Sequence, residues 1–353
     1  MLPLSDKIIR IIEESRHSTA KFVNAQMLVA YYNIGQLIVE EMQSGKARAE
    51  YGIGLLKQVS EELSHTFKKG FSVQNLERMR LFYSTYSNSS KALRNSDIFE
   101  KSSNVLRISS GENMATTLLP LSWSHYLFLL GIDNETERQF YEVESFNNQW
   151  TLKELERQYN AGLFLRLTKG KNKAAIMQLA THGQKIETAT DILKDPLMLE
   201  FLGLTEHSGY SETELETAII NQLETFMLEL GKGFFFGGRQ VRFSFNEDHF
   251  FVDLVFYNRF LKCFILIDLK IGKLKHQDLG QMQMYINYYD RFVKQPDENP
   301  TIGIILCRHK NDALVEITLP ENNRQLYAQK YLTMLPTKDE LKKLIEKDYG
   351  KTE

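Results

Sequence analysis

The C-terminal part of the chain alternates short apolar runs with turn residues, which is the pattern of β-strands. Residues 234–245 read as one strand with a kink at Gly237-Gly238, and residues 250–270 as two strands joined by a turn at Asn258-Arg259. Further strands are predicted at 301–307 and 327–332, and helices at 212–230, 276–292 and 338–348. The pattern predicts an α/β domain in which helices flank a mixed sheet of at least four strands.

The first two hundred residues show helical periodicity instead. Helices are predicted at 6–43, 55–67, 73–86, 123–130, 135–144 and 151–167. Residues 87–113 are rich in Ser and Asn, which predicts a flexible surface loop, and Asp195-Pro196 is predicted to begin a short helix that ends at Gly203. We place the domain boundary at His207-Ser208-Gly209, so that an all-α domain of residues 1–205 precedes the α/β domain of residues 206–353.

Two of the N-terminal helices are separated by a short glycine-containing turn at residues 68–72. Arg78 and Arg80 follow on the second of these helices, away from the apolar face formed by Leu76, Met79 and Phe82. This arrangement suggests a helix-turn-helix unit that contacts DNA through the two arginines. Any two packed helices joined by a glycine turn produce the same pattern.

Charged side chains interrupt the apolar hairpin of residues 250–270 at Asp253, Asp268 and Lys270. Side chains alternate faces along a strand, so Asp268 and Lys270 point to one side and Leu269 to the other. Burying a carboxylate costs roughly several kcal/mol unless a partner or a metal ion compensates for it. One interpretation is an Asp268–Lys270 pair on a solvated face. The apolar flanks favour a second one, a divalent-metal site with a lysine beside it.

The helix predicted at 212–230 carries several acids besides its apolar stripe. On a helical wheel Glu216 falls inside that stripe, and an acid facing a sheet needs an explanation. Glu212 also lies within the arc, at the first turn, where the helix dipole favours it. Glu224 and Glu229 fall at the edge of the stripe or outside it, and we expect them to be solvated. Glu216 is therefore the acid predicted to join the site.

Composition narrows the class of protein. The chain has 353 residues, 42% of them hydrophobic, and a net charge of -2, so any nucleic-acid surface must be local. Residues 258–294 supply one, with seven Lys or Arg against three acids. Two cysteines without zinc spacing, no signal-peptide pattern and no apolar run of membrane length predict a reduced, cytoplasmic protein without a membrane partner.

Several longer strings carry a resemblance to a known family: GRQVRF, FFVDLVFYN, LIDLKIGKLKHQDLGQMQMYINYYDR and DPLMLEFLGL. Together with Asp253 and Asp268-Leu269-Lys270, they resemble the PD-(D/E)XK nuclease superfamily and, within it, the YhcG-like bacterial PDDEXK nucleases with a helical N-terminal domain. The likeness covers essentially the whole chain. One departure is Val252, where the superfamily has a proline before its first aspartate.

The resemblance implies a restriction-endonuclease-like fold and a role for each motif residue. Asp253, Asp268 and Glu216 would hold Mg²⁺ or Mn²⁺, and Lys270 would act on the attacking water. Gln281 and Tyr285, four residues apart on one helical face, are similar to a motif that some members carry on the helix after the lysine. Lys273 and Lys275, beside Arg78 and Arg80, are predicted to contact DNA. Arg239 and Gln240 are polar residues inside the first strand, and they either serve the structure or contact a DNA phosphate near the site.

The function expected from these features is metal-dependent hydrolysis of DNA phosphodiester bonds by an endonuclease acting in recombination, repair or defence against foreign DNA. The alternative is a module on a nuclease fold that binds nucleic acid or protein without cutting. The motif of Asp253, Asp268 and Lys270 is complete, which favours the enzyme. The sequence leaves open whether the protein forms a homo-oligomer.

Overall fold

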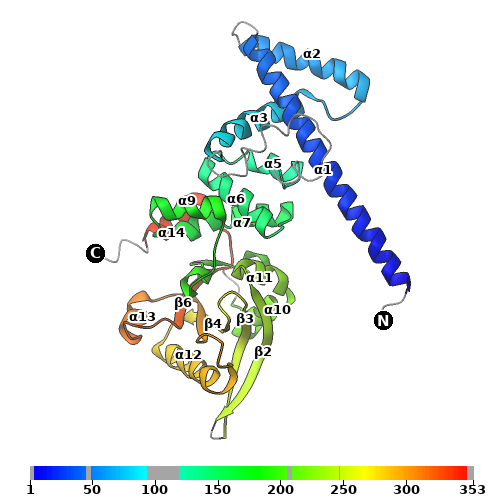
Figure 1. The fold of residues 1–353 in the computed structure, drawn as a ribbon. Helices are drawn as coiled ribbons and strands as arrows, with labels where there is room; N and C mark the ends of the chain where they lie inside the picture. Colours follow the sequence, from blue (N-terminus) through cyan, green and yellow to red (C-terminus); the bar gives the residue numbers. More distant parts are fainter. Residues whose placement is uncertain (1–3, 45–48, 94–118, 205–208, 246, 348–353) are drawn as a thin grey trace. The chain divides into compact units, whose positions relative to one another are not determined.

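A computed structural model describes residues 4–44, 49–93, 119–204, 209–245 and 247–347 (Figure 1). Contacts divide the chain into two compact units, Met1–Leu155 and Glu156–Glu353. The boundary predicted from composition lies further along the chain, around residues 205–208, which fall outside the described residues. The predicted boundary stays a prediction, because it marks a change in sequence composition, whereas the two units are defined by contacts between residues.

The first unit is helical, as predicted. Its helices are α1 (Leu4–Ser44), α2 (Ala49–Phe67), α3 (Val73–Leu93), α5 (Trp123–Leu129), α6 (Glu135–Asn147) and the first turn of α7 (Leu152–Asn160). Buried Leu28, Leu76, Met79, Phe82 and Tyr126 form much of its interior. α2 begins at Ala49 rather than at residue 55, where the sequence pattern predicts its start, and α3 runs through the first residues of the predicted 87–113 loop. Residues 94–113 of that loop lie outside the described residues.

The helices α1 and α3 cross in close contact at Gly35. A Cβ atom at Gly35 would lie 2.1 Å from the carbonyl oxygen of Met79, so only glycine allows this approach. Aromatic side chains fill the space beside the crossing, where the rings of Tyr32 and Tyr83 lie 5.0 Å apart between centroids. The pairing of α1 with α3 therefore depends on a residue without a side chain.

The second unit is built on a mixed six-stranded sheet in the order β1-β6-β5-β4-β3-β2. Its strands are β1 (Leu197–Met198), β2 (Phe234–Phe245), β3 (Asp248–Asn258), β4 (Cys263–Lys273), β5 (Ile302–His309) and β6 (Leu326–Leu332). β2, β3 and β4 pair antiparallel, whereas β4, β5, β6 and β1 pair parallel. The kink predicted in β2 is a shift in register between Phe236 and Gly238.

Helices cover both faces of this sheet. α10 (Glu212–Asn221) and α11 (Leu223–Leu230) pack with Ile265, Ile267 and Leu269 of β4 on one face. α12 (His276–Tyr288) and the π-helix Tyr289–Val293 pack with Leu266 on the other. The unit also contains α8 (Leu163–Thr168), α9 (Lys173–His182), α13 (Asp312–Thr318), α14 (Lys338–Lys347) and two 3-10 turns, Ala189–Ile192 and Glu200–Leu202. The α/β class with flanking helices is confirmed.

Three predicted elements of this unit differ in the structure. Asp195-Pro196 does not begin a helix; the peptide bond is cis, and β1 follows it and pairs with β6. The helix predicted at 212–230 breaks at Gln222, and the one predicted at 151–167 breaks at Gly162, whose φ of 62° lies in the left-handed region.

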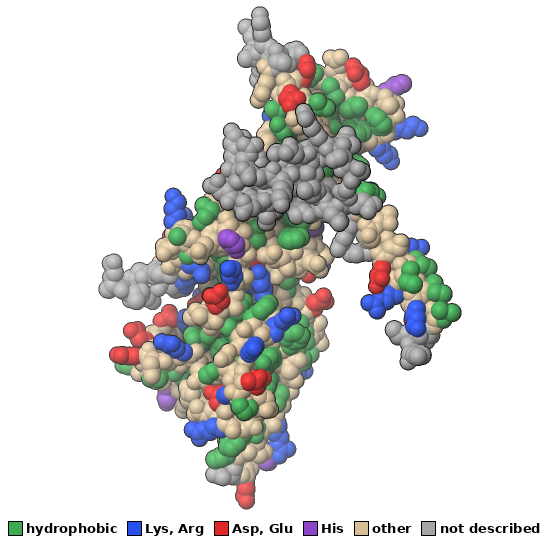
Figure 2. Space-filling model, viewed as in Figure 1, with side chains coloured by type: hydrophobic (Ala, Val, Ile, Leu, Met, Phe, Trp, Pro, Cys, Tyr) green, Lys and Arg blue, Asp and Glu red, His purple; other side chains and the backbone are tan. Residues whose placement is uncertain are grey.

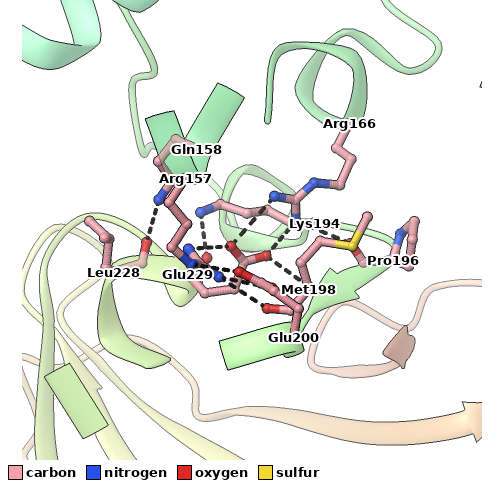
Figure 3. Close-up of polar contacts among 9 residues, drawn as sticks. All are labelled: Arg157, Gln158, Arg166, Lys194, Pro196, Met198, Glu200, Leu228 and Glu229. Carbon is pink, nitrogen blue, oxygen red and sulfur yellow. Dashed lines mark hydrogen bonds and ion pairs between the residues drawn. The ribbon is translucent and has the colours of Figure 1, made fainter. Parts of the chain in front are cut away.

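A buried ionic cluster ties the start of the second unit to α11 (Figure 3). Glu229 of α11 is fully buried and accepts hydrogen bonds from Arg166, from Arg157 at 3.2 Å and from the backbone N–H of Met198 at 3.0 Å. Lys194 donates to the backbone carbonyl of Glu229. The expectation that Glu229 is solvated was wrong, because the cations that pair with it lie far earlier in the sequence.

The first turns of α1 carry exposed apolar side chains, and Figure 2 shows apolar side chains on this part of the helix. Exposed members include Leu4, Ile8, Ile9, Ile11 and Ile12. None of the helices among the described residues is long and apolar enough to cross a membrane.

Candidate functional site

The β3–β4 hairpin places two of the predicted acids next to each other. Leu254 of β3 pairs with Ile267 of β4, and continuing this register by one residue sets Asp253 opposite Asp268. The Asp253 carboxylate also accepts a hydrogen bond of 2.8 Å at Oδ2 from the backbone N–H of Leu269. The apolar residues of the hairpin thus fix two carboxylates on one face of neighbouring strands.

Lys270 lies on the same face as Asp268, as the alternation of side chains predicts. Its Nζ is 2.7 Å from Asp268 Oδ2 and 3.8 Å from a carboxylate oxygen of Glu212. The Asp268 side chain is only 4% exposed. Although its Oδ2 lies at ion-pair distance from the lysine, it accepts no hydrogen bond of good geometry from any described residue. A buried carboxylate oxygen with such incomplete pairing could accept a further cation.

Burial dominates the electrostatics of the three groups. Burial is the largest influence on Asp268 and raises its pKa to about 7. The charge of Lys270 lowers this pKa, whereas the charge of Asp253 raises it. The pKa of Asp253 is also raised by burial, although its hydrogen bond from Leu269 opposes the change. For Lys270, burial lowers the pKa but the charge of Asp268 outweighs it, so the net pKa is raised. The lysine is therefore an ammonium ion at neutral pH.

Glu216 is buried on α10, as the helical wheel predicted. The helix begins at a capping box in which Ser211 and Glu214 bond each other's backbone N–H groups, and this fixes the turn on which Glu216 lies. Arg239 donates to Glu216 Oε1, and Gln240 donates to Glu216 Oε2. Gln240 also lies 2.9 Å from Asp253 Oδ1. The structure thus brings Glu216 to the hairpin acids through Gln240.

Gln281 and Tyr285 lie on α12, on the face of the sheet to which Asp268 and Lys270 point. Gln281 donates a hydrogen bond to the Tyr285 hydroxyl, so the two act as one unit. The Tyr285 ring is buried edge-on against Phe243, with 5.5 Å between centroids. Burial raises the pKa of Tyr285, the hydrogen bond from Gln281 opposes that rise, and the charges of Asp268 and Asp253 add to it.

The residues predicted to contact DNA fall into three groups. Arg239 and Gln240 lie within the acidic site and bond its carboxylates. Lys273 and Lys275 are exposed at the end of β4 and the start of α12. Arg78 and Arg80 are half-buried in the other unit, and each bonds a residue of its own helix, Asn75 and Glu77. Their contact with DNA stays a prediction.

The residues present suit a divalent ion held at an open site. No group of three or more His, Cys, Asp or Glu side chains stands ready to hold a metal ion anywhere in the described ranges. Mg²⁺, however, is usually bound through one or two carboxylates together with water and substrate phosphate. Asp253 and Asp268 supply two such carboxylates on neighbouring strands, and Asp268 Oδ2, which is ion-paired with Lys270 but accepts no hydrogen bond from a described residue, supplies an oxygen that a divalent cation would satisfy.

Two residues of this network were not singled out as site residues from the sequence. Glu212 contacts Lys270, and Thr217 accepts a hydrogen bond of 3.0 Å from Arg239. Glu212 was noted on the inward arc and set aside as a first-turn acid. Thr217 carries no charge, and its position next to Glu216 was the only available signal.

Two family models match the chain, one in each half. Residues 190–346 match the YhcG PDDEXK nuclease domain, and residues 7–166 match the DUF1016 N-terminal domain. The chain is also 36% identical over 352 residues to the protein named "Putative nuclease YhcG" from Escherichia coli (strain K12). The matched region covers 96% of this chain and 92% of that protein. The chain belongs to the YhcG family of PDDEXK nucleases.

Membership of the YhcG family supports nuclease activity and implies a nucleic-acid substrate. PDDEXK nucleases generally use divalent metal ions. Among solved structures, the crystal structure of a repair endonuclease from Pyrococcus abyssi matches 36% of this chain and 49% of that chain, so the match spans about half of its length. At 16% identity and a TM-score of 0.24, this likeness is too slight to bear on fold or activity.

Proposed function

We propose that this protein is a Mg²⁺- or Mn²⁺-dependent DNA endonuclease that hydrolyses phosphodiester bonds at the site around Asp253. The observation that carries the proposal is the placement of Asp253, Asp268 and Lys270 on one face of the β3–β4 hairpin, with Glu216 joined to Asp253 through Gln240. Two carboxylates and an ammonium ion in this arrangement match the needs of phosphodiester hydrolysis.

In this proposal Asp253 and Asp268 would hold the metal ion, together with the backbone carbonyl of Leu269 and with Glu216 assisting. When bound, the ion supplies Lewis-acid activation of the attacking water and neutralises charge at the phosphate. Lys270 remains charged beside Asp268 and stabilises the negative charge that develops on the phosphoryl group. The Gln281–Tyr285 pair directs a hydroxyl or an amide toward the water or the scissile phosphate.

DNA as the substrate, and a role in recombination, repair or defence, are the finer parts of the proposal. Exposed Lys273 and Lys275 border the hairpin and would bind phosphates near the acids. The N-terminal helices would contribute through the unit around α2 and α3. A homo-oligomer is possible, and sedimentation of the purified protein can determine the oligomeric state.

The rival proposal is a module that binds nucleic acid or protein without cutting. The observation that favours it is the Lys270–Asp268 ion pair at 2.7 Å, since a lysine held by an acid could serve structure alone. The two proposals differ in one result, which is cleavage that depends on a divalent ion.

The test is incubation of the purified full chain with linear, nicked, single-stranded and four-way-junction DNA, and with RNA, in Mg²⁺, in Mn²⁺ and in EDTA. We expect cleavage of at least one DNA substrate with either ion and none in EDTA. The Asp253→Asn and Asp268→Asn variants, prepared in the same way, should be inactive. If both variants cut as fast as the parent, any cleavage comes from elsewhere, and if binding occurs without cleavage, the rival proposal is favoured.

A further inference from the structure

Both carboxylate oxygens of Glu216 are already bonded in this structure. Arg239 Nε donates to Oε1 and Gln240 Nε2 donates to Oε2. The Glu216 side chain is only 5% exposed, so it can form few hydrogen bonds with water. A buried carboxylate needs such partners, and an ion that uses Glu216 as a ligand must displace at least one of them.

Arg239 is suited to be the partner that leaves. Its side chain is 37% exposed, whereas that of Glu216 is almost entirely buried, so the guanidinium can turn to solvent while the carboxylate cannot. Its other contact is one hydrogen bond of 3.0 Å to Thr217 on the same helix. The guanidinium thus holds α10 through two neighbouring side chains of that helix.

Gln240 is held in place by an unusual backbone. Its φ of 48° lies in the left-handed region, which favours glycine and costs a glutamine free energy. The register shift between Phe236 and Gly238 sets this residue between the pairs Arg239–Leu254 and Val241–Val252, directly opposite Asp253. A strained residue whose amide bonds two acids at once, Glu216 and Asp253, points to a role in the site.

We propose that Arg239 is an internal counter-ion: it occupies Glu216 while no metal is bound and must release it when a divalent ion binds, while Gln240 keeps Glu216 beside Asp253. This inference rests on the metal site of the proposed function. It assigns Arg239 to the acidic site rather than to DNA phosphate. Arg239 and the ion compete for one carboxylate, so each weakens the binding of the other.

The test is calorimetric titration of the full chain with Mn²⁺ alone, without nucleic acid. Arg239→Gln should bind Mn²⁺ about fivefold more tightly or better, because the competing charge is gone. Its melting temperature in EDTA should fall, because Glu216 loses its charged partner. The matched control is Arg242→Gln, an arginine of the same strand that bonds His249 instead of an acid, and it should change neither value.

A double-mutant cycle makes the test specific. In a Glu216→Gln background, the change Arg239→Gln should no longer alter Mn²⁺ affinity. If Arg239→Gln does not fold, Arg239→Lys, which keeps the charge but loses the planar fork, should give a smaller gain in affinity.

The outcomes separate this inference from the proposed function. If Asp253→Asn abolishes Mn²⁺ binding while Arg239→Gln leaves it unchanged or weaker, the metal site stands and the counter-ion role is overturned. Unchanged Mn²⁺ affinity together with a reduced salt dependence of DNA binding would return Arg239 to a phosphate contact. If Asp253→Asn binds Mn²⁺ as the parent does, the metal site itself is overturned, and the inference with it.

Discussion

Two buried glutamates on neighbouring helices, Glu216 and Glu229, differ in how far the sequence reveals them. Glu216 faces inward on the wheel of its own helix, and its burial was predicted correctly. Glu229 falls outside the apolar stripe, yet it is buried because Arg157 and Arg166 close over it. A helical wheel reports the side of the helix but not what another segment brings to that side.

The Glu229 cluster predicts a large loss of stability from a small change. Replacing Glu229 by Gln removes the buried carboxylate that pairs with Arg157 and Arg166, and we expect the free energy of unfolding to fall by about 3–5 kcal/mol. Urea denaturation at pH 7 measures it. The control is Glu224→Gln, an exposed acid on the same helix, which should change little. Equal losses in both variants would contradict the account.

The same cluster predicts a dependence on pH. Burial alone would raise the pKa of Glu229, but the charges of Arg166, Lys194 and Arg157 outweigh it and lower the pKa to about 2. A carboxyl whose pKa is lowered on folding contributes stability above its unfolded pKa, and that contribution is lost as pH falls toward the folded value. The difference in the free energy of unfolding between the parent and Glu229→Gln should therefore narrow as the pH falls from 4.5 toward 2.

At the scale of elements, the crossing of α1 and α3 depends on Gly35. Gly35→Ala would bring a Cβ to 2.1 Å from the Met79 carbonyl oxygen, so the helices must separate, at a cost of about 1–3 kcal/mol. The control is Gly54→Ala on α2, where a Cβ meets no atom within 4 Å and alanine should stabilise the helix by up to about 1 kcal/mol. Thermal unfolding of the two variants should shift in opposite directions. A Gly35→Ala variant that melts at or above the parental temperature would contradict this account of the crossing.

Much of the order of elements could be predicted because each element carries its own period. The β3–β4 hairpin, the strand at β5 and the helix α12 were found from local alternation and apolar runs. β1 could not be found, since two residues have no period and their strand exists only by pairing with β6. The bond between Gln240 and the two acids was equally hidden, because it depends on a register shift and a left-handed residue.

At the scale of the whole molecule, the account predicts a DNA path beside the β3–β4 hairpin. If Lys273 and Lys275 bind phosphates, replacing either by Gln should weaken binding to all sequences alike and reduce the salt slope of log K by about one. Lys342→Gln, an exposed lysine on α14, serves as the control. The same measurement on Arg78→Gln and Arg80→Gln tests whether the helical unit contacts DNA. Unchanged slopes for Lys273 and Lys275 would place the DNA elsewhere.

The central claim is that the hairpin site cuts DNA, and Lys270 tests it most directly. Lys270→Met keeps the aliphatic stem and removes the charge, so the fold should survive. Because the lysine acts mainly on the transition state, metal-dependent cleavage should fall by about 10²-fold or more. DNA affinity should fall by less than about tenfold, since one charge contributes little beside the remaining phosphate contacts. Cleavage by Lys270→Met at the parental rate would contradict the account and leave Lys270 as no more than the ion-pair partner of Asp268.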